Sequence, residues 1–378
     1  MAAPVALPTD GERASARGSS LPPELAAASA IANEDGRVEE AIALLDRAIA
    51  RLPECAEAHA MRGMALLSVG RFEEGFAAYE WRHRVSGCEG NKPALPRWNG
   101  EPLPGKTLLL WDEQGFGDNI QFARFVERAA RSSQARIVLH VHPAVRRLMA
   151  SCRGADAVEA REGRPPAAHA QLSLLSIPAA LRLGAADLLA EAPWLAPEPA
   201  LVQRWRGRLD AAAPRPRPRI GVAWQGNPRH QRDGRRSIPL AAFAPVVRAW
   251  AARATFVSLQ KAPASDAIIT NALPIVDFGV DLDGGYDALV DTAAIMSSLD
   301  LVITSDTSIA HLAAALGAPV WVVLSRPCDW RWGQDGERSA FYPNARLLRQ
   351  RDPGDWSGAM DELAVALEVW WFRDRRDA

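Results

Sequence analysis

The residues with the most evident chemistry follow an apolar run at positions 301–303. This run has the character of a buried parallel strand, and residues 305–307 (SDT) then supply types that commonly begin helices. The N–H groups at a helix start favour a phosphate, and ligands of open α/β sheets bind at this end of the strands. Because His311 lies one helical turn after Thr307, both side chains can face one ligand. A capped core helix with a buried histidine is the alternative.

A carboxylate holds a comparable position earlier in the chain. Residues 107–111 (TLLLW) predict a buried strand, and the loop after it contains Gly115, Gly117 and Asp118 before a helical pattern begins. The glycines would let a ligand approach the backbone closely. Asp118 could act as a general base, or it could cap the helix. A helix start lowers a carboxylate pKa and weakens the base, unless the site is desolvated.

Donor groups are dense in a third loop, residues 225–237, which follows a predicted strand at 219–224. Such a set would suit a diphosphate, and a solvated basic loop is the alternative. The next predicted strand, 255–259, ends at Gln260 and Lys261. The donors of residues 225–237 are Asn227, Arg229, His230, Arg232, Arg235 and Arg236.

Three further patterns are set aside. Residues 100–107 fit the G-x4-G-K-T phosphate loop, but that loop must follow a strand and open a helix, and here a strand comes after it instead. Asp281 and Asp283 resemble a metal-binding D-x-D, yet they lie in a loop next to two glycines. His140 and His142 share one strand face without a third ligand nearby. No metal is therefore expected.

The three loops described above each follow a predicted strand, so parallel sheets are needed to position them. The alternation of predicted strands and helices indicates two α/β halves. The Pro-Arg segment 214–219 is expected to be a stiff, solvated spacer between them. The first half has expected strands at 107–111, 135–141, 156–159 and 171–175 and a helix at 144–150. The second has strands at 219–224, 255–259, 301–303 and 320–324 and helices at 291–299 and 356–373.

A repeat precedes the first half. Residues 36–42 (GRVEEAI) match residues 70–76 (GRFEEGF) at an offset of 34 residues, the period of tetratricopeptide repeats. Residues 23–86 resemble about two such repeats. Two repeats bury too little surface to stand alone, so they should pack on the first α/β half. They could dock a protein or peptide, or they could serve as a structural brace.

Composition narrows the classes of function. The 378 residues include Lys+Arg 44 and Asp+Glu 45, a formal charge of −1 that gives no electrostatic case for nucleic-acid or membrane partners. The four cysteines are scattered, as in a reducing compartment. Residues 1–22 are rich in Ala, Pro, Ser and Gly and are expected to be disordered, without a signal-peptide core. We expect a cytoplasmic protein without membrane insertion.

Two motifs resemble a known family. Residues 115–118 (GFGD) resemble the G-x-G-D loop of the ADP-heptose:lipopolysaccharide heptosyltransferases, glycosyltransferase family 9. Residues 306–317 (DTSIAHLAAALG) resemble that family's D-T-x-x-x-H-L-x-A-A-L motif. A longer resemblance, from about residue 23 onward, is to bacterial proteins that fuse tetratricopeptide repeats to such a domain. It is carried by WNGEPLPGKTLLLWDEQGFGDNIQFARF, AWQGNPRH, RRSIPL, FVSLQK and DWRW.

The resemblance implies a GT-B fold, with two Rossmann-like domains facing a cleft, and an inverting transfer that needs no metal or other cofactor. It divides the chain into repeat helices at 23–90, an acceptor-side domain at 91–213 and a nucleotide-sugar domain at 214–378. Asp118 matches the catalytic base. The expected substrate-binding residues within the matching motifs are Gly115, Gly117, Asn119, Asp306, Thr307, Ser308 and His311. Arg235 or Arg236 is expected to contact the diphosphate, and Trp224, Asn227 and Gln260 are added from their loop positions.

The resulting hypothesis is a nucleotide-sugar glycosyltransferase whose repeats select a protein or peptide acceptor. Fused proteins of this kind are associated with protein glycosylation. Two alternatives remain. The chain could be a non-catalytic scaffold whose transferase-like domain senses a nucleotide sugar, or it could be a nucleotide-sugar epimerase of the same two-domain architecture.

Overall fold

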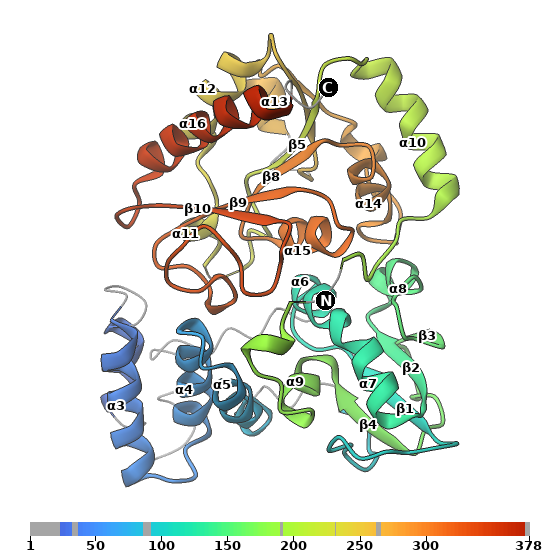
Figure 1. Ribbon diagram of the computed structural model, residues 1–378, viewed down its shortest axis with the longest axis vertical. Coiled ribbons are helices and arrows are strands. Elements are labelled where there is room, and N and C mark those ends of the chain that lie inside the picture. The colour runs from blue at the N-terminus through green and yellow to red at the C-terminus, as the bar shows by residue number, and fades with distance from the viewer. Residues whose placement is uncertain are drawn as a thin grey trace. The chain divides into compact units, whose positions relative to one another are not determined.

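A computed structural model describes residues 23–31, 37–85, 92–189, 192–230, 232–261 and 266–374. The expected disorder of residues 1–22 and the Gly36 end of the repeat lie outside these ranges. The chain divides into two compact units (Figure 1). One comprises Met1–Glu191 with Pro327–Pro343, and the other comprises Ala192–Arg326 with Asn344–Ala378.

The first unit begins with a helical segment (blue in Figure 1). Amphipathic spacing explains it: the longest of its helices buries Val38, Ala41, Ile42, Leu45 and Ala48 along one face. The helical character expected for this segment is confirmed, and its assignment as tetratricopeptide repeats stays a prediction. The segment consists of α2 (Pro23–Ala30), α3 (Val38–Arg51), α4 (Ala56–Ser68), α5 (Phe72–Tyr79) and the 3-10 helix η2 (Glu80–Arg84).

A parallel four-stranded sheet of order β3-β2-β1-β4 forms the rest of this unit. All of the strands expected in this half are present, each within two residues of its expected ends. Its strands are β1 (Thr107–Trp111), β2 (Arg136–Val141), β3 (Ala157–Ala160) and β4 (Ala170–Ser173). Its helices are α6 (Phe116–Phe122), α7 (Val126–Ser133), α8 (Pro143–Met149) and α9 (Ile177–Ala180), with 3-10 turns η3 (Ala123–Phe125), η4 (Leu174–Ser176) and η5 (Ala185–Asp187).

The second unit contains a parallel six-stranded sheet of order β10-β9-β8-β5-β6-β7. Helices α12 (Leu240–Trp250) and α16 (Trp356–Asp374) pack together and supply much of the apolar core around this sheet. The strands are β5 (Arg219–Ala223), β6 (Thr255–Ser258), β7 (Ile275–Val276), β8 (Leu301–Ser305), β9 (Val320–Leu324) and β10 (Ala345–Arg349). The helices are α10 (Pro199–Ala212), α11 (Asp233–Arg236), α12 (Leu240–Trp250), α13 (Asp266–Thr270), α14 (Val290–Met296), α15 (Ser308–Ala315) and α16 (Trp356–Asp374), with the 3-10 turn η6 (Gly279–Asp281).

The borders of the two units differ from the expected division after residue 213. Helix α10 belongs to the second unit, where Trp205 Nε1 donates to Asp291 Oδ1 at 2.6 Å. The Pro-Arg segment 214–219 is also tied to that unit, because Arg215 forms an ion pair with Asp300 at 2.7 Å. Residues 214–217 are exposed, as expected of a solvated segment, but the segment lies within the second unit rather than between the two units.

The segment Pro327–Pro343 returns to the first unit and carries η7 (Trp330–Trp332). Trp330 of this segment lies among the rings of Phe76, Tyr79, Phe122 and Phe341, with centroids 6.1 to 6.5 Å away. Aromatic contacts with both the helical segment and α6 explain why this segment belongs to the first unit. Of the helices in the described ranges, none combines the length and apolar character needed to cross a membrane.

Candidate active site

The loop after β1 holds its carboxylate at the start of α6. Gly115 is the N-cap, and Asp118 Oδ2 accepts a hydrogen bond from its N–H at 2.8 Å. The side chain of Asn119 spans the same loop: its Oδ1 accepts from the Glu113 N–H at 3.3 Å, and its Nδ2 donates to Gly115 O at 2.8 Å. Asn119 thus braces the loop. The helix-capping interpretation of Asp118 is correct, and it leaves Oδ1 for other partners.

Arg331, from η7, is the main partner of that second oxygen. Its Nη2 lies 2.5 Å from Asp118 Oδ1, and its Nε donates to Gln121 Oε1 at 2.9 Å. Its Nη1 pairs with Asp329 Oδ1 at 2.9 Å. Burial alone would lower the pKa of Arg331, but the Asp118 and Asp329 carboxylates raise it above its ordinary value. Arg331 is therefore a permanent cation beside the candidate base.

Burial raises the pKa of the Asp118 carboxyl above its ordinary value. The charge of Arg331 and the Gly115 N–H oppose that rise without reversing it. The helix start was expected to weaken a base at this position, and desolvation was expected to strengthen it. In the structure desolvation is the larger effect, and a carboxylate with a raised pKa accepts a proton more readily at neutral pH.

A second carboxylate in the loop, Glu113, has the opposite environment. Arg82 of η2 holds it with Nη2 at 2.5 Å from Oε1 and Nε at 3.1 Å from Oε2, and the Ser173 hydroxyl donates to it. Burial would raise the pKa of Glu113, but Arg82 lowers it below its ordinary value. Glu113 is thus a fixed anion. Asp118 and Glu113 thus have oppositely shifted pKa values, an arrangement in which two carboxylates often take separate roles in catalysis.

In the second unit, the predicted helix start after β8 is present. Thr307 is the N-cap of α15, and its Oγ1 accepts from the Ile309 N–H at 3.2 Å. Thr307 and His311 are buried, whereas Asp306 and Ser308 are partly exposed. These positions fit a ligand-facing helix start as well as a capped core helix.

The loops after β5 and β6 meet beside this helix start, because β5 lies between β6 and β8 in the sheet. Gln260 Oε1 accepts the N–H groups of Trp224 at 3.1 Å and Gln225 at 2.9 Å. The Trp224 side chain lies in the apolar core, so only its main chain reaches the loop. In the structure Gln260 therefore braces the loop backbone, and Trp224 packs in the apolar core.

Of the basic residues in that region, Arg236 is partly buried and Arg235 is exposed. Arg236 Nε donates to Asp233 Oδ1 at 3.4 Å, and Gly226 gives its guanidinium room, since a Cβ there would lie 2.5 Å from Nη2. Asn227 is exposed, and its Oδ1 accepts from the Arg229 N–H at 3.0 Å. Arg235 and Asn227 are thus accessible to a ligand, whereas Arg236 is held in place.

In the phosphate-loop, D-x-D and histidine patterns, the residues described next cap helices, form an ion pair or lead into a strand. Residues 100–106 contain no helix or strand and lead directly into β1. Asp283 caps α14 by accepting from the Asp291 N–H at 2.7 Å, and Asp281 pairs with Arg208 at 2.7 Å. His142 caps α8 through Nδ1. Within the described ranges, no group of three or more His, Cys, Asp or Glu residues is arranged to hold a metal ion.

Four members of the site were not predicted from the sequence, namely Glu113, Arg82, Gln121 and Arg331. Glu113 was within the loop, but its sequence position gives no sign of a buried partner. The only signal for Arg331 was the DWRW segment, which resembles the family but indicates no contact.

Comparisons with known proteins agree with a transferase fold. Residues 211–324 match the family model "Glycosyltransferase family 9 (heptosyltransferase)". Protein FlbA of Caulobacter vibrioides is 28% identical over 363 residues, covering 88% of this chain and 59% of that protein. The chain thus spans 59% of this relative's length.

Two solved structures are similar in fold. A glycosyl transferase family 9 protein from Veillonella parvula has a TM-score of 0.54 at 13% identity, covering 73% of this chain and 100% of that one. The ADP-heptose lps heptosyltransferase II of E. coli has a TM-score of 0.50 at 13% identity, covering 71% and 99%. Residues 211–324 therefore resemble glycosyltransferase family 9, and the chain has a mixed α/β fold with parallel sheets similar to that of these two transferases.

Proposed function

We propose that this chain transfers a sugar from a nucleotide-sugar donor to a hydroxyl group of a protein or peptide, with inversion and without a metal. The observation that carries the proposal is the setting of Asp118, a helix-capping and largely buried carboxylate of raised pKa that follows the carboxyl end of β1. A fixed carboxylate of this kind is what a general base for an alcohol requires.

Several features support a donor site in the second unit. The family-model match falls at residues 211–324, which include β5, β6, β8 and α15. The start of α15 after Thr307 and the basic loop with Arg235 offer a helix dipole and a cation for a diphosphate. The similar E. coli enzyme is named for an ADP-linked heptose, so we take a nucleotide sugar as the donor class.

In the proposed step, the acceptor hydroxyl attacks the anomeric carbon of the donor sugar. The bond from that carbon to the diphosphate oxygen breaks, and the nucleoside diphosphate leaves with the electron pair. The hydroxyl proton passes to Asp118, whose oxygens have lone pairs beyond the hydrogen bond from Gly115 and the ion pair with Arg331. Arg331 fixes the carboxylate in one orientation, and the helix dipole and basic loop stabilise the leaving group.

The helical segment is proposed to dock the acceptor, with tetratricopeptide-like packing. Supporting this, η2 joins the segment to the active-site loop through the Arg82–Glu113 pair. A structural brace would need the same pair. Acceptor binding is therefore the property that separates the two roles.

The test compares Asp118 with Asp187, which has the same two kinds of partner but a pKa lowered by Arg128. Asp187 caps η5 by accepting from Gly184 N–H at 3.0 Å and pairs with Arg128 at 2.6 Å, as Asp118 does with Gly115 and Arg331. A thermal-shift screen against ADP-, GDP-, UDP- and CMP-linked sugars first identifies the donor. Asp118→Asn should keep donor binding and lose at least about a hundredfold in turnover, and Asp187→Asn should keep both.

The alternatives give different results in the same experiment. A sensor would bind the donor without releasing nucleoside diphosphate. An epimerase would convert the donor sugar with no acceptor and no release. Equal turnover by Asp118→Asn and the parent protein would remove Asp118 as the base.

A further inference from the structure

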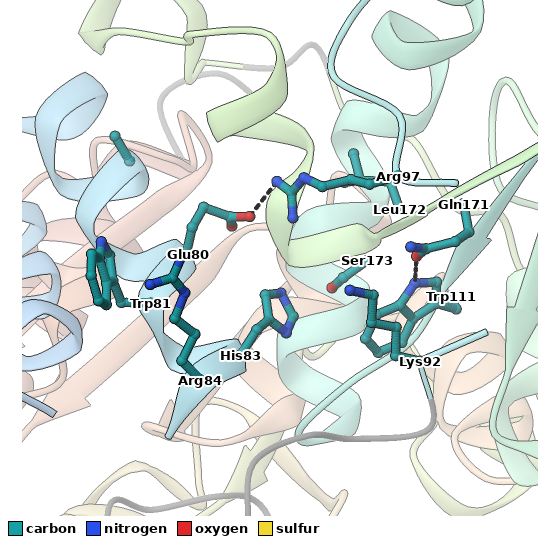
Figure 2. A pocket seen from close by; sticks show the side chains of 11 residues that line it. Glu80, Trp81, His83, Arg84, Lys92, Arg97, Trp111, Gln171, Leu172 and Ser173 are labelled. Carbon is teal, nitrogen blue, oxygen red and sulfur yellow. Dashed lines mark hydrogen bonds and ion pairs between the residues drawn. The ribbon is translucent and has the colours of Figure 1, made fainter. Parts of the chain in front are cut away.

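A pocket of about 410 Å³ lies within the first unit, between η2 of the helical segment and the β1–β4 side of the sheet (Figure 2). Its volume is in the range of small-ligand sites. None of its lining residues is among those assigned above to the donor. Trp81 and His83 line one wall, and Trp111, Gln171 and Ser173 line the other.

Three cationic side chains line this pocket together with the single carboxylate of Glu80. Arg84 comes from η2, and Lys92 and Arg97 come from the segment before β1. Both oxygens of Glu80 are already bound, one by Arg82 at 2.8 Å and the other by Arg97. Lys92 is exposed and forms no ion pair with any residue in the ranges that the structure describes. Arg84 is also paired, with Glu54 at 3.1 Å. The lining residues themselves carry a net positive charge, and Lys92 is the cation among them without an ion pair in the described ranges.

His83 does not add to this charge. Burial lowers the pKa of His83 to about 4, and the neighbouring Arg82 acts in the same direction, so the ring is neutral at pH 7. Its Nε2 lies 3.3 Å from Ser176 Oγ. A neutral imidazole beside three cations gives the pocket a polar floor that can hydrogen-bond an anionic ligand.

The aromatic walls do not favour a nucleotide. The Trp81 ring is stacked on His59 at 3.8 Å with an interplanar angle of 10°, and the Arg84 guanidinium lies 4.3 Å from its centroid. Protein groups therefore take up the surface that a nucleobase would need. The Trp111 indole N–H is likewise bound to Gln171 Oε1 at 2.5 Å. The lining group left to bind a ligand by charge is the Lys92 ammonium, with the paired guanidiniums of Arg84 and Arg97 nearby, and this combination suits a carboxylate.

The pocket is connected to the candidate base within the same unit. His83 contacts Ser176, whose hydroxyl accepts from Arg82 at 2.8 Å, and Arg82 holds Glu113 of the Asp118 loop. An acceptor chain bound at this pocket would thus lie along one hydrogen-bonded network with the catalytic loop.

We infer that this pocket binds an acidic side chain of the acceptor polypeptide, so that the enzyme selects hydroxyl residues that lie near a Glu or Asp. The inference rests on the proposed function for the identity of the ligand as an acceptor. The binding of an acidic peptide by this pocket can be measured without any donor.

The experiment uses protein labelled with 5-fluorotryptophan and observed by fluorine NMR, with the Trp81 and Trp111 resonances assigned through Trp81→Phe and Trp111→Phe. The probe is a synthetic decapeptide of Gly, Ser and four Glu residues, compared with the same peptide carrying Gln at each Glu. We expect the Glu peptide to shift both pocket resonances in a saturable way and to leave that of Trp205, in the other unit, unchanged. The Gln peptide should shift none of them.

Lys92→Gln and Arg97→Gln should each weaken the Glu peptide about threefold to fivefold, as expected for solvent-accessible charge pairs. The double variant should lose about tenfold or more, and added salt should weaken binding to the parent protein. Lys106→Gln and Arg146→Gln, which remove exposed cations outside the pocket, are the matched controls and should bind as the parent does.

Equal binding of the two peptides, or unchanged binding by Lys92→Gln and the double variant, would overturn the inference. Inorganic phosphate that binds more tightly than the peptide and gives the same shifts would also overturn it, because the site would then serve a free anion. Donor-induced thermal stabilisation of Lys92→Gln is measured in parallel. If neither the parent protein nor Lys92→Gln is stabilised by any donor, the result counts against the proposed transferase. If both are stabilised by the donor but the parent does not bind the Glu peptide, the result counts against the pocket alone.

Discussion

Replacing Arg331 with alanine removes the cation that faces the candidate base. The Arg331 and Asp118 side chains are 8% and 18% exposed, so the change leaves a largely buried carboxylate without its counterion. Breaking such a pair costs about 3–5 kcal/mol when both groups are fully buried. Because Asp118 keeps some solvent contact, we expect a loss near the lower end, about 3 kcal/mol in the free energy of unfolding.

The assay is urea unfolding of a double-mutant cycle with Arg331→Ala, Asp118→Asn and the two together. Neutralising Asp118 removes the uncompensated charge, so the double variant should be more stable than the sum of the single changes predicts. We expect a coupling energy above about 1 kcal/mol. Arg331→Lys keeps the charge but cannot hold Gln121 and Asp118 together as a guanidinium does, so it should fall between the parent and Arg331→Ala.

The pH dependence of the cycle has a definite sign. Folded Asp118 has a raised pKa, so its contribution to stability is full in acid, below its ordinary pKa, and is lost as pH rises through the folded value. Arg331 opposes this loss, and therefore Arg331→Ala should be more destabilising at neutral pH than in acid. Free energies that add to within about 0.5 kcal/mol, or a destabilisation that does not change with pH, would refute this electrostatic reasoning.

Three further predictions concern packing and titration. Gly63→Ala should lose about 1–3 kcal/mol of unfolding free energy in urea, because its Cβ would lie 2.6 Å from Tyr79 N. The control Gly207→Ala meets no atom within 4 Å and should be neutral or stabilising. Similar losses in both variants would contradict the close approach of α4 and α5. The free energy of unfolding should fall by up to about 3 kcal/mol as pH drops from 6.5 towards 4, because the pKa of His83 is lowered to about 4 in the folded protein. His83→Gln should flatten this pH dependence. An unchanged pH dependence in the variant would mean that another group titrates. Burial raises the pKa of Cys152 to about 12, so peptide mapping after iodoacetamide treatment at about pH 8 should find it unmodified in the folded protein and modified in urea, and its rapid alkylation without urea would contradict its burial.

Much of the fold could be predicted from local pattern. Residues 301–324 combine an apolar strand, capping residues and a glycine stop, and the structure places β8, α15 and β9 there. Elements whose ends are not marked by such residues were not predicted from the sequence. Strand β10 (ARLLR) begins and ends near Arg residues at the edge of the sheet, and α12 contains Pro245 inside an otherwise apolar run.

The site was predictable at the level of loops and less so at the level of side chains. A polar residue after a parallel strand must lie at the carboxyl edge of the sheet, which is why the loops holding Asp118, Gln260 and Thr307 could be located. Whether a polar side chain faces a ligand or braces its own loop depends on neighbours that sequence spacing does not reveal. Asn119 and Gln260 proved to be hydrogen-bonded to loop backbone. The return of Pro327–Pro343, which brings Arg331 to Asp118, is a long-range contact without a local pattern.

The central claim is that Asp118 activates the nucleophile of a sugar transfer. Its most direct test is the rate of nucleoside diphosphate release from the donor that stabilises the protein most, with water standing in for the acceptor hydroxyl. We predict measurable release by the parent protein and by Asp187→Asn, and a loss of at least about a hundredfold in Asp118→Asn with donor affinity unchanged. No release by the parent with any nucleotide sugar that it binds, or an equal rate from Asp118→Asn, would contradict the claim.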